Sequence, residues 1–384
     1  MIICIVSDTY PLARPFGGMA VYTQTAAQAL TARGHTVHVL VPCSDASRDL
    51  AEGAVQVHYR HVSWMPLIGR FVPALGESYG IARALRELHA RHRFDIVEFP
   101  NFEGVGLVSQ WRDFVPCVVR LHTSMAESVE VQTRAPRLGE RFMMWAEKQS
   151  ARRARGVVTH SVSHRDRLAK IYDLSGIHII PHGIALPPCR EAEPAEPAEP
   201  AVLTLGRLTA RKGGPTLLAA IPLIHAAVPE ASFTIVGASD AHPLARRFRE
   251  EHSQIPRERV IFHEFVDGDA LAALYASATV YASASVYESF GLTFVEAMAR
   301  GIPVVGCATS SMNEIIAHER TGLLVPALDA PAFAAAVTRL LADPALRRRL
   351  GAEGRRVCVE KYTAARMAAD IEAWYRDVLS RCTP

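Results

Sequence analysis

The chain has 384 residues, a length that predicts two domains more readily than one. Apolar residues make up 49% and charged residues 21%, which is typical of globular proteins with well-filled cores. The formal net charge of +3 argues against a dedicated nucleic-acid-binding protein, because such proteins depend on a large excess of basic residues. The seven cysteines are scattered without a Cys-x-x-Cys pair, so we expect reduced, buried thiols and no zinc site built on them.

The N-terminal sequence predicts a buried strand and not a targeting segment, since residues 1–6 are apolar but few and carry no basic leader. No uninterrupted apolar stretch reaches the ~18–20 residues needed to span a bilayer. We therefore expect a cytoplasmic protein. The Ala- and Arg-rich composition is typical of a GC-rich bacterium.

Short β-branched runs alternate with helix-like segments along almost the whole chain. The first half contains predicted strands at 2–6, 36–41, 55–59, 95–99, 117–121, 156–159 and 178–180, with a helical pattern over 19–33 between the first two. The second half contains predicted strands at 202–205, 232–236, 260–262, 279–282, 303–305 and 322–325. This alternation predicts an α/β protein whose parallel sheets are covered by helices on both faces.

Three Ala-Glu-Pro units near the middle of the chain predict an extended linker. We place the linker at 188–200, an N-terminal domain at 1–187, a C-terminal domain at 201–362 and a final helical segment at 363–384. Each domain reads as a doubly wound sheet, whose functional residues lie at the carboxyl ends of its strands. Two such edges that face one another would form an interdomain cleft.

The most informative motif follows the predicted strand at 279–282. A polar turn carries Glu288, and a helix that contains Glu296 opens at Phe290-Gly291-Leu292. Gly291 allows a ligand to approach the backbone, and the free N–H groups of a helix start favour phosphate. The two carboxylates could accept hydrogen bonds from sugar hydroxyls. In the alternative reading Glu288 caps the helix and Glu296 is solvated, which explains each carboxylate but not their combination.

Two further glycine-bearing loops follow predicted strands. Arg207 and Lys212 lie in the loop after 202–205. The guanidinium group of Arg207 could bind a diphosphate through two parallel hydrogen bonds, and the ammonium group of Lys212 could bind it as a compact positive charge. Gly17 and Gly18 follow the first strand at a helix start, which suggests close approach to an anion. The alternatives are solvated basic side chains for the first loop and a glycine turn without a ligand for the second.

Together these motifs resemble those of the family-four retaining glycosyltransferases, which have the GT-B fold with two facing Rossmann-like domains and an interdomain cleft. The Glu-x7-Glu spacing of Glu288 and Glu296 is the most specific part of the resemblance. Leu121-His122, Val162-Ser163 and the segment 180–184 match as well. The likeness extends from the first strand to 322–325.

The resemblance implies a role for each residue that contacts the nucleotide part of the donor. Arg207 and Lys212 would hold the diphosphate and offset the charge on the leaving group. Glu296 would bind the ribose hydroxyls. Gly17 and Gly18 would close over the phosphates from the N-terminal domain, which would also bind the acceptor.

The resemblance also implies which residues surround the reacting sugar. Glu288 and the backbone of Phe290, Gly291 and Leu292 would hold the donor sugar. His122 would lie beside it, so the implied catalytic group comprises His122, Glu288 and the two cations already named. The segment 363–384 would cross back to the N-terminal domain.

The sequence departs from the family pattern in two places. His182 stands where the family usually has Asn. Thr309-Ser310-Ser311-Met312 stands where the family tends to have glycines, in a loop close to the donor.

The resemblance implies retaining transfer by a front-face route, without a metal or another cofactor. It also makes a UDP-sugar the favoured donor and a GDP-sugar the alternative. Asp267-Gly-Asp269 has the spacing of a metal-binding pair but is predicted to begin a helix.

The acceptor class is left open by the sequence: a small molecule, a glycan or a lipid-linked hydroxyl. The segment 60–72 is both basic and apolar, which fits peripheral contact with an anionic membrane or, in the alternative favoured here, a loop lining a soluble acceptor pocket. Two other functions compete with transfer. These are a nucleotide-sugar epimerase of the same fold and a non-catalytic nucleotide-sugar-binding relative.

Overall fold

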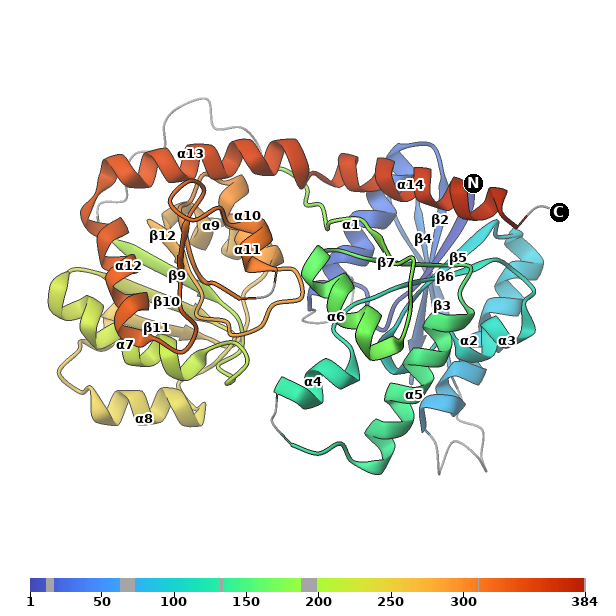
Figure 1. Cartoon of the computed structure of the whole chain (residues 1–384), viewed down its shortest axis with the longest axis horizontal. Coiled ribbons are helices and arrows are strands. Elements are labelled where there is room, and N and C mark those ends of the chain that lie inside the picture. The colour runs from blue at the N-terminus through green and yellow to red at the C-terminus, as the bar shows by residue number, and fades with distance from the viewer. Residues whose placement is uncertain (12–16, 63–72, 132–133, 188–198, 310, 383–384) are drawn as a thin grey trace. The chain divides into compact units, whose positions relative to one another are not determined.

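The computed structural model describes residues 1–11, 17–62, 73–131, 134–187, 199–309 and 311–382 (Figure 1). The chain divides into two compact units. The first unit combines Met1–Gly183 with Ala364–Pro384, and the second is Ile184–Thr363. Most of the predicted linker at 188–200 lies outside the described residues.

The first unit is built on an eight-stranded sheet in the order β3-β4-β2-β1-β5-β6-β7-β8. All neighbouring strands are parallel except the antiparallel pair β3 and β4. The strands are β1 (Ile2–Val6), β2 (Thr36–Cys43), β3 (Arg48–Glu52), β4 (Val55–His61), β5 (Ile96–Pro100), β6 (Cys117–Arg120), β7 (Gly156–Thr159) and β8 (His178–Ile179). The edge strand β3 was not predicted, because its residues are mostly exposed and lack an apolar alternation.

Helices cover both faces of this sheet (Figure 1). They are α1 (Gly18–Ala32), α2 (Pro73–His92), α3 (Leu107–Arg112), α4 (Met125–Val131), α5 (Leu138–Arg153), α6 (Val162–Tyr172) and α14 (Ala364–Ser380). The helices α1 and α14 pack side by side against the face to which Ile3 and Ile5 point. The opposite face carries Cys4 and Val6 and is covered mainly by α2. This alternation along β1 is the pattern expected of a strand buried on both faces.

The C-terminal helix α14 is an integral part of the first unit. Ile371 and Tyr375 are fully buried in the same cluster as the strands β1, β2 and β4. The hydroxyl of Tyr375 donates a hydrogen bond of 2.9 Å to the buried carboxylate of Glu98 on β5. The last segment of the chain is therefore fixed to the first unit by both apolar and polar contacts.

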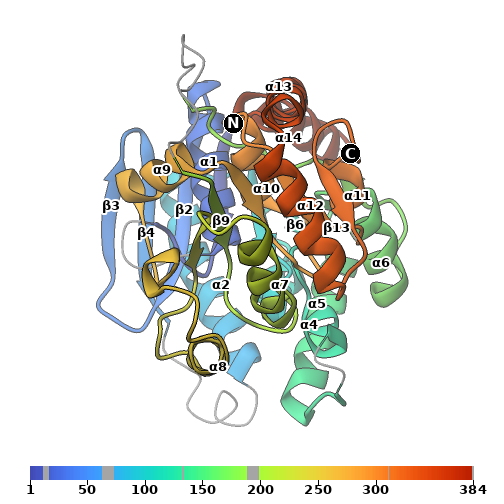
Figure 2. The same cartoon turned by 90° about the vertical axis from the view of Figure 1, so that its left-hand side faces the viewer.

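The second unit is built on a six-stranded parallel sheet in the order β11-β10-β9-β12-β13-β14. Its strands are β9 (Ala201–Leu205), β10 (Ser232–Val236), β11 (Val260–His263), β12 (Val280–Ala282), β13 (Val304–Cys307) and β14 (Leu323–Val325). Its helices are α7 (Gly214–Ala227), α8 (Pro243–Glu251), α9 (Gly268–Ser277), α10 (Leu292–Ala299), α11 (Met312–Ile315), α12 (Ala330–Ala342) and α13 (Pro344–Lys361). The helices α7 and α12 lie side by side on one face, as Figure 2 shows, and α10 packs on the other.

The helix α9 begins where the Asp-x-Asp spacing predicted a helix start. Asp267 is its N-terminal capping position and Gly268 its first residue. No helix in the described ranges is both long and apolar enough to cross a membrane.

The cysteines within the described residues are all free thiols. Four of them are buried: Cys4, Cys117, Cys307 and Cys358. Burial raises the pKa of Cys117 to about 12 and that of Cys307 to about 11, which keeps both thiols protonated and unreactive.

Candidate active site

Two loops of the second unit meet at the carboxyl ends of adjacent strands. The loop 206–213 follows β9, and the loop 283–291 follows β12. The carbonyl oxygen of Arg211 accepts a hydrogen bond of 3.0 Å from the backbone N–H of Val286. Gly213 has a φ of +65°, and a Cβ at this position would overlap the carbonyl oxygen of Ala284. Only glycine therefore allows the two loops to approach this closely.

This contact brings Lys212 and Glu288 together. The Lys212 Nζ lies 2.6 Å from Glu288 Oε1 and 2.8 Å from Oε2, so the ammonium group spans both carboxylate oxygens. The two side chains are 24% and 11% exposed, which leaves the pair reachable by a ligand. Arg207 lies in the same loop as Lys212 and is exposed.

A third segment, which contains Ser311 and Met312, contacts the loop 283–291 just before α10. Ser311 is fully buried, and its hydroxyl contacts the carbonyl oxygens of Glu288 and Phe290 at 2.8 and 2.9 Å. A Cβ on Gly291 would overlap the methyl group of Met312. This third segment departs from the family pattern in sequence, and its serine and methionine hold the backbone that precedes α10.

The start of α10 is shaped by backbone and not by a side-chain cap. Gly291 is the N-terminal capping residue, with a φ of +104° and no side-chain hydrogen bond. Glu288 therefore does not cap this helix, and that alternative reading is wrong. The ring of Phe290 is buried edge-on against Tyr362, with centroids 5.8 Å apart, so it is the backbone from Phe290 to Leu292 that a ligand could meet. A helix start of this kind favours an anion through its first N–H groups and its dipole.

Glu296 is held by a specific hydrogen bond. It is half-buried on α10, and the hydroxyl of Tyr275 donates to its Oε2 at 2.7 Å. The Arg300 guanidinium lies over the Tyr275 ring at 4.4 Å. Burial raises the pKa of Glu296, while Tyr275 and Arg300 act in the opposite direction. The alternative reading of Glu296 as a solvated helix residue is therefore wrong.

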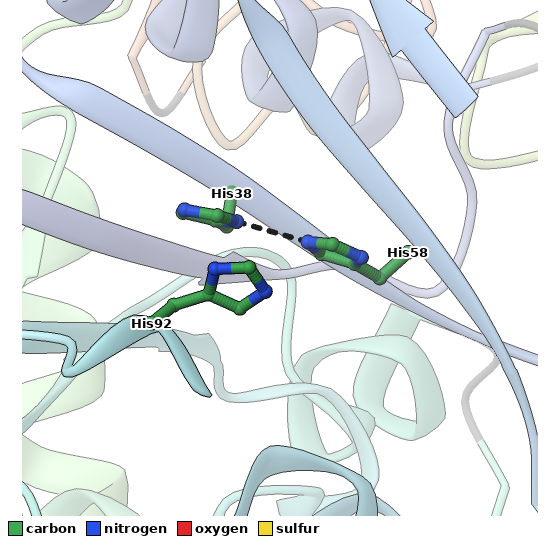
Figure 3. A group of neighbouring side chains, drawn as sticks. All are labelled: His38, His58 and His92. Atoms are coloured by element: carbon green, nitrogen blue, oxygen red, sulfur yellow. Dashed lines mark hydrogen bonds between the residues drawn. The ribbon is translucent and has the colours of Figure 1, made fainter. Parts of the chain in front are cut away.

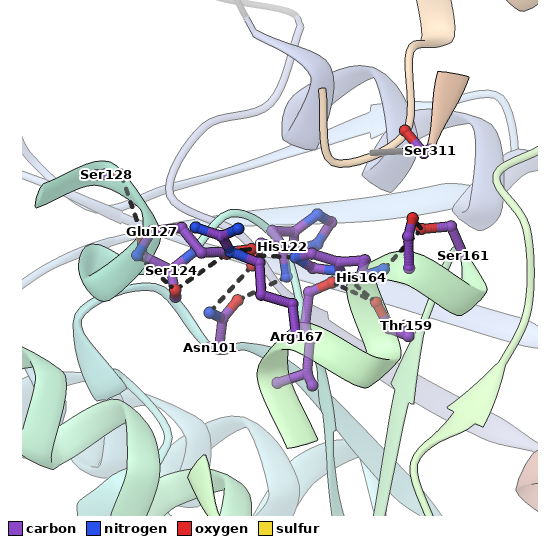
Figure 4. Close-up of polar contacts among 12 residues, drawn as sticks. Asn101, His122, Ser124, Glu127, Ser128, Thr159, Ser161, His164, Arg167 and Ser311 are labelled. Atoms are coloured by element: carbon purple, nitrogen blue, oxygen red, sulfur yellow. Dashed lines mark hydrogen bonds and ion pairs between the residues drawn. The ribbon is translucent and has the colours of Figure 1, made fainter. Parts of the chain in front are cut away.

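His122 lies in the first unit, at the carboxyl end of β6, and its backbone is fixed by one side chain. The fully buried Asn101 accepts a hydrogen bond of 2.7 Å from the His122 N–H and donates one of 3.2 Å to its carbonyl oxygen (Figure 4). Burial, aided by the charge of Arg120, lowers the pKa of His122 to about 3. The imidazole is therefore neutral near pH 7 and can act as a hydrogen-bonding group.

Two buried histidines stack beside His122. The rings of His160 and His182 lie 4.6 Å apart, and the His182 ring is nearly parallel to that of His122 at 5.8 Å. The ring of Tyr22 from α1 covers His182 at 4.8 Å. Burial lowers the pKa of both His160 and His182 well below the usual value. His182 is thus part of an aromatic stack in the first unit.

A buried carboxylate completes this polar cluster. Glu127 accepts hydrogen bonds from the backbone N–H and the hydroxyl of Ser124 at 2.8 and 3.0 Å. His164 lies between Glu127, at 3.3 Å from its Nε2, and Thr159, at 2.5 Å from its Nδ1 (Figure 4). The cluster orders the strand ends around His122.

Gly17 and Gly18 open α1 of the first unit, and both are exposed. Gly17 has an ordinary φ of −94°, and among the described residues no atom lies within 4 Å of a Cβ built on it. The fold itself therefore does not require glycine at position 17. The residues 12–16 before it lie outside the described part of the chain.

The sequence-based reasoning brought Lys212 and Glu288 to one sheet edge, where the structure pairs them. Asn101 and Tyr275, which hold His122 and Glu296, were not predicted. Ser311 was placed in a loop close to the donor, but its contact with the Glu288 loop was not predicted. A signal existed for Asn101, because it lies two residues after the predicted strand at 95–99. Ser311 and Tyr275 act through contacts that only the tertiary fold creates.

Comparisons with known proteins agree with this architecture. The family described as "Glycosyltransferase Family 4" matches residues 16–186, and the family described as "Glycosyl transferases group 1" matches residues 199–343. The chain is 28% identical over 382 residues to the D-inositol 3-phosphate glycosyltransferase of Xylanimonas cellulosilytica, covering 90% of this chain and 89% of that protein. It is 30% identical over 285 residues to the alpha-maltose-1-phosphate synthase of Mycolicibacterium smegmatis, covering 67% of this chain and 73% of that protein.

A solved structure has a similar fold over nearly the full length of the chain. The sucrose-phosphate synthase of Thermosynechococcus elongatus matches with a TM-score of 0.81 and 25% sequence identity over 99% of both chains. The protein is therefore a glycosyltransferase with the GT-B fold. The chain belongs to glycosyltransferase family four, as its motifs predicted.

Replacing Gly213 by alanine should destabilise the second unit more than replacing Gly268. Both glycines have positive φ, but a Cβ on Gly268 would have no atom of the described residues within 4 Å. We expect Gly268→Ala to cost about 1 kcal/mol, the strain of a left-handed alanine. Gly213→Ala should cost about 1–3 kcal/mol more, because the loops must separate. Urea unfolding followed by circular dichroism measures the difference, and equal costs would contradict the proposed loop contact.

Replacing His182 by the asparagine usual in the family should make the first unit less sensitive to acid. Because the folded pKa of His182 is lowered, only the unfolded chain binds this proton as the pH falls below about 6.5. Stability is then fully present above that pH and is lost below it, by about 1.4 kcal/mol per pH unit for one proton. The four tryptophans all lie in the first unit, so their fluorescence reports its unfolding selectively. Equal pH slopes for wild type and His182→Asn between pH 6.5 and 5 would contradict this account.

Proposed function

We propose that the protein transfers a sugar from a nucleoside-diphosphate sugar to an acceptor hydroxyl with retention of configuration and without a metal cofactor. A UDP-sugar is the proposed donor, and a GDP-sugar is the alternative. The observation that carries the proposal is the Lys212–Glu288 pair, which is set between two strand ends beside the glycine-capped start of α10.

The Lys212 ammonium group is oriented by Glu288, which suits it to bind a diphosphate and then to stabilise the negative charge of the departing diphosphate. An ammonium group has three donors, and the two oxygens of Glu288 engage two of them. The third is available to a phosphate oxygen, and the exposed Arg207 offers a bidentate fork from the same loop. As the bond between the anomeric carbon and the phosphate oxygen breaks, these cations and the α10 start offset the charge that develops.

The proposed substitution takes place on one face of the sugar. The acceptor oxygen bonds to the anomeric carbon on the side from which the diphosphate leaves, and the acceptor proton passes to the departing phosphate oxygen. His122 is assigned to orient the reacting sugar or the acceptor by hydrogen bonding, since its low pKa keeps the imidazole neutral.

Glu296 is assigned to the ribose of the donor. Tyr275 holds its Oε2, which leaves Oε1 to accept a hydrogen bond from a ribose hydroxyl. A carboxylate that is half-buried and already oriented loses little side-chain conformational entropy when it binds a ligand.

The names of the three reported relatives point to a class of acceptor. One name refers to an inositol phosphate, and the two synthases are named after phosphorylated products, a maltose phosphate and a sucrose phosphate. We therefore propose a phosphorylated polyol or sugar as the acceptor, with a lipid-linked acceptor as the alternative. Residues 63–72 of the basic and apolar segment 60–72 lie outside the described part of the chain, so that segment does not distinguish the two.

A thermal-shift panel of UDP, GDP, ADP and the common UDP- and GDP-sugars, in chelator and without added metal, tests the donor proposal. A ligand that binds only the folded protein raises its melting temperature. We expect one nucleotide family to raise it in wild type and to do so much less in Glu296→Ala. That variant should lose about 1–3 kcal/mol of binding free energy, the scale of a hydrogen bond to a charged group. The exposed Glu230→Ala serves as the control. No shift at millimolar concentration would contradict the donor proposal.

Lys212→Ala should lower kcat by a larger factor than it weakens binding of the free nucleoside diphosphate. The interaction of its ammonium group with the diphosphate is strongest in the transition state, when negative charge develops on the leaving group. Lys212→Arg, which keeps the charge, should retain more of the turnover. Both kcat and the dissociation constant of the diphosphate are measured. A loss confined to binding would contradict the leaving-group role.

A further inference from the structure

Three histidines converge in the first unit, away from the strand ends that carry His122. His38 lies on β2, His58 on β4, and His92 is the last residue of α2 (Figure 3). One ring nitrogen from each lies within 4.8 Å of the other two. His38 Nδ1 and His58 Nε2 are 2.9 Å apart. No sequence motif indicates this group, since positions 38, 58 and 92 follow no ligand spacing.

A carboxylate fixes the orientation of His58. Its Nδ1 lies 2.7 Å from Asp49 Oδ1 on β3, and Arg60 holds the same oxygen at 2.6 Å. Because an ionised carboxylate only accepts hydrogen bonds, the proton of neutral His58 lies on Nδ1. The lone pair on Nε2 therefore points toward His38. A carboxylate that orients a histidine in this way is typical of metal sites.

Two of the three histidines are shielded from solvent. His38 and His58 are buried, and the neutral imidazole is the form that binds a metal ion. His92 is only half-buried, which gives an ion a route from solvent. The buried ring of Phe94 packs on His38 at 5.2 Å and forms an apolar wall.

We propose that His38, His58 and His92 bind one divalent transition-metal ion, with Zn²⁺ the best match, and that the ion clips α2 to the strands β2 and β4. Neutral imidazoles are good ligands for Zn²⁺, and three of them with one water complete a tetrahedral site at about 2.0–2.1 Å. Ligation through His38 Nδ1 needs small ring rotations and a change of tautomer that moves the His38 proton from Nδ1 to Nε2. The site shares no residue with the proposed donor site, so it is independent of the metal-free transfer proposed above.

The competing explanation is a metal-free pair in which His38 Nδ1–H donates to His58 Nε2 and His92 only packs beside them. The two explanations differ in what His92 does. In the first it is a ligand, and in the second it contributes ring contacts with His38 at 4.4 Å and His58 at 5.5 Å. His89, one turn earlier on α2, is also half-buried but lies outside the group, so His89→Gln is a matched control for His92→Gln.

The test is a Zn²⁺ titration of the chelator-treated full chain, with bound metal measured by mass spectrometry and the melting temperature followed in parallel. We expect one Zn²⁺ per chain, a rise in melting temperature, and with Co²⁺ the visible absorption of a four-coordinate site. Asp49→Asn should weaken Zn²⁺ binding about 10–100-fold, the scale of losing the group that orients a ligand. His92→Gln should weaken it at least as much, and His89→Gln should not change it.

Equal Zn²⁺ affinity in His92→Gln and His89→Gln, or no saturable binding near one ion per chain in wild type, would overturn the proposal. Circular dichroism of each variant without metal separates loss of a ligand from loss of the fold. None of these readouts uses transferase activity, so the result is independent of the proposed donor and acceptor.

Discussion

The second unit of this protein depends on the close approach of two loops at the ends of β9 and β12. Gly213 permits that approach, because any side chain at this position would meet the carbonyl oxygen of Ala284. The same contact places Lys212 on Glu288 and so creates a cation that is oriented before a ligand arrives. Preorganised charge of this kind stabilises a leaving group without reorganisation during the reaction. The site is thus determined mainly by backbone geometry at glycines.

In the first unit, the polar groups near His122 are arranged around a buried charge, the guanidinium group of Arg120. Arg120 is fully buried at the end of β6, pairs with Glu98 at 3.1 Å and lies over the Tyr22 ring at 4.5 Å. A buried ion pair is costly unless further hydrogen bonds satisfy it. The hydroxyls of Tyr22 and Tyr375 both donate to Glu98, whereas Nη1 and Nη2 of Arg120 have no hydrogen-bond partner among the described residues. The positive charge beside them helps to keep the neighbouring histidines neutral.

Much of the fold could be predicted from sequence, because parallel strands buried on both faces are continuous apolar runs. The edge strand β3 could not be predicted from sequence, since its residues are mostly exposed and it forms only by pairing with β4. Lys212 and Glu288 could be placed together because both follow strands whose carboxyl ends share one sheet edge. The partners Ser311 and Tyr275 could not, because they come from other segments that only tertiary packing brings near. The three converging histidines were missed for the same reason.

The central claim, that the loops 206–213 and 283–291 with α10 form the donor site, is tested most directly by hydrogen exchange with and without a nucleoside diphosphate. Exchange reports on each peptide separately and so locates the ligand. The account predicts that UDP, or GDP as the alternative base, slows exchange in peptides spanning 206–214 and 285–296, with little change at β3 and β4. Binding without protection in those two segments, or protection confined to other parts of the chain, would contradict it.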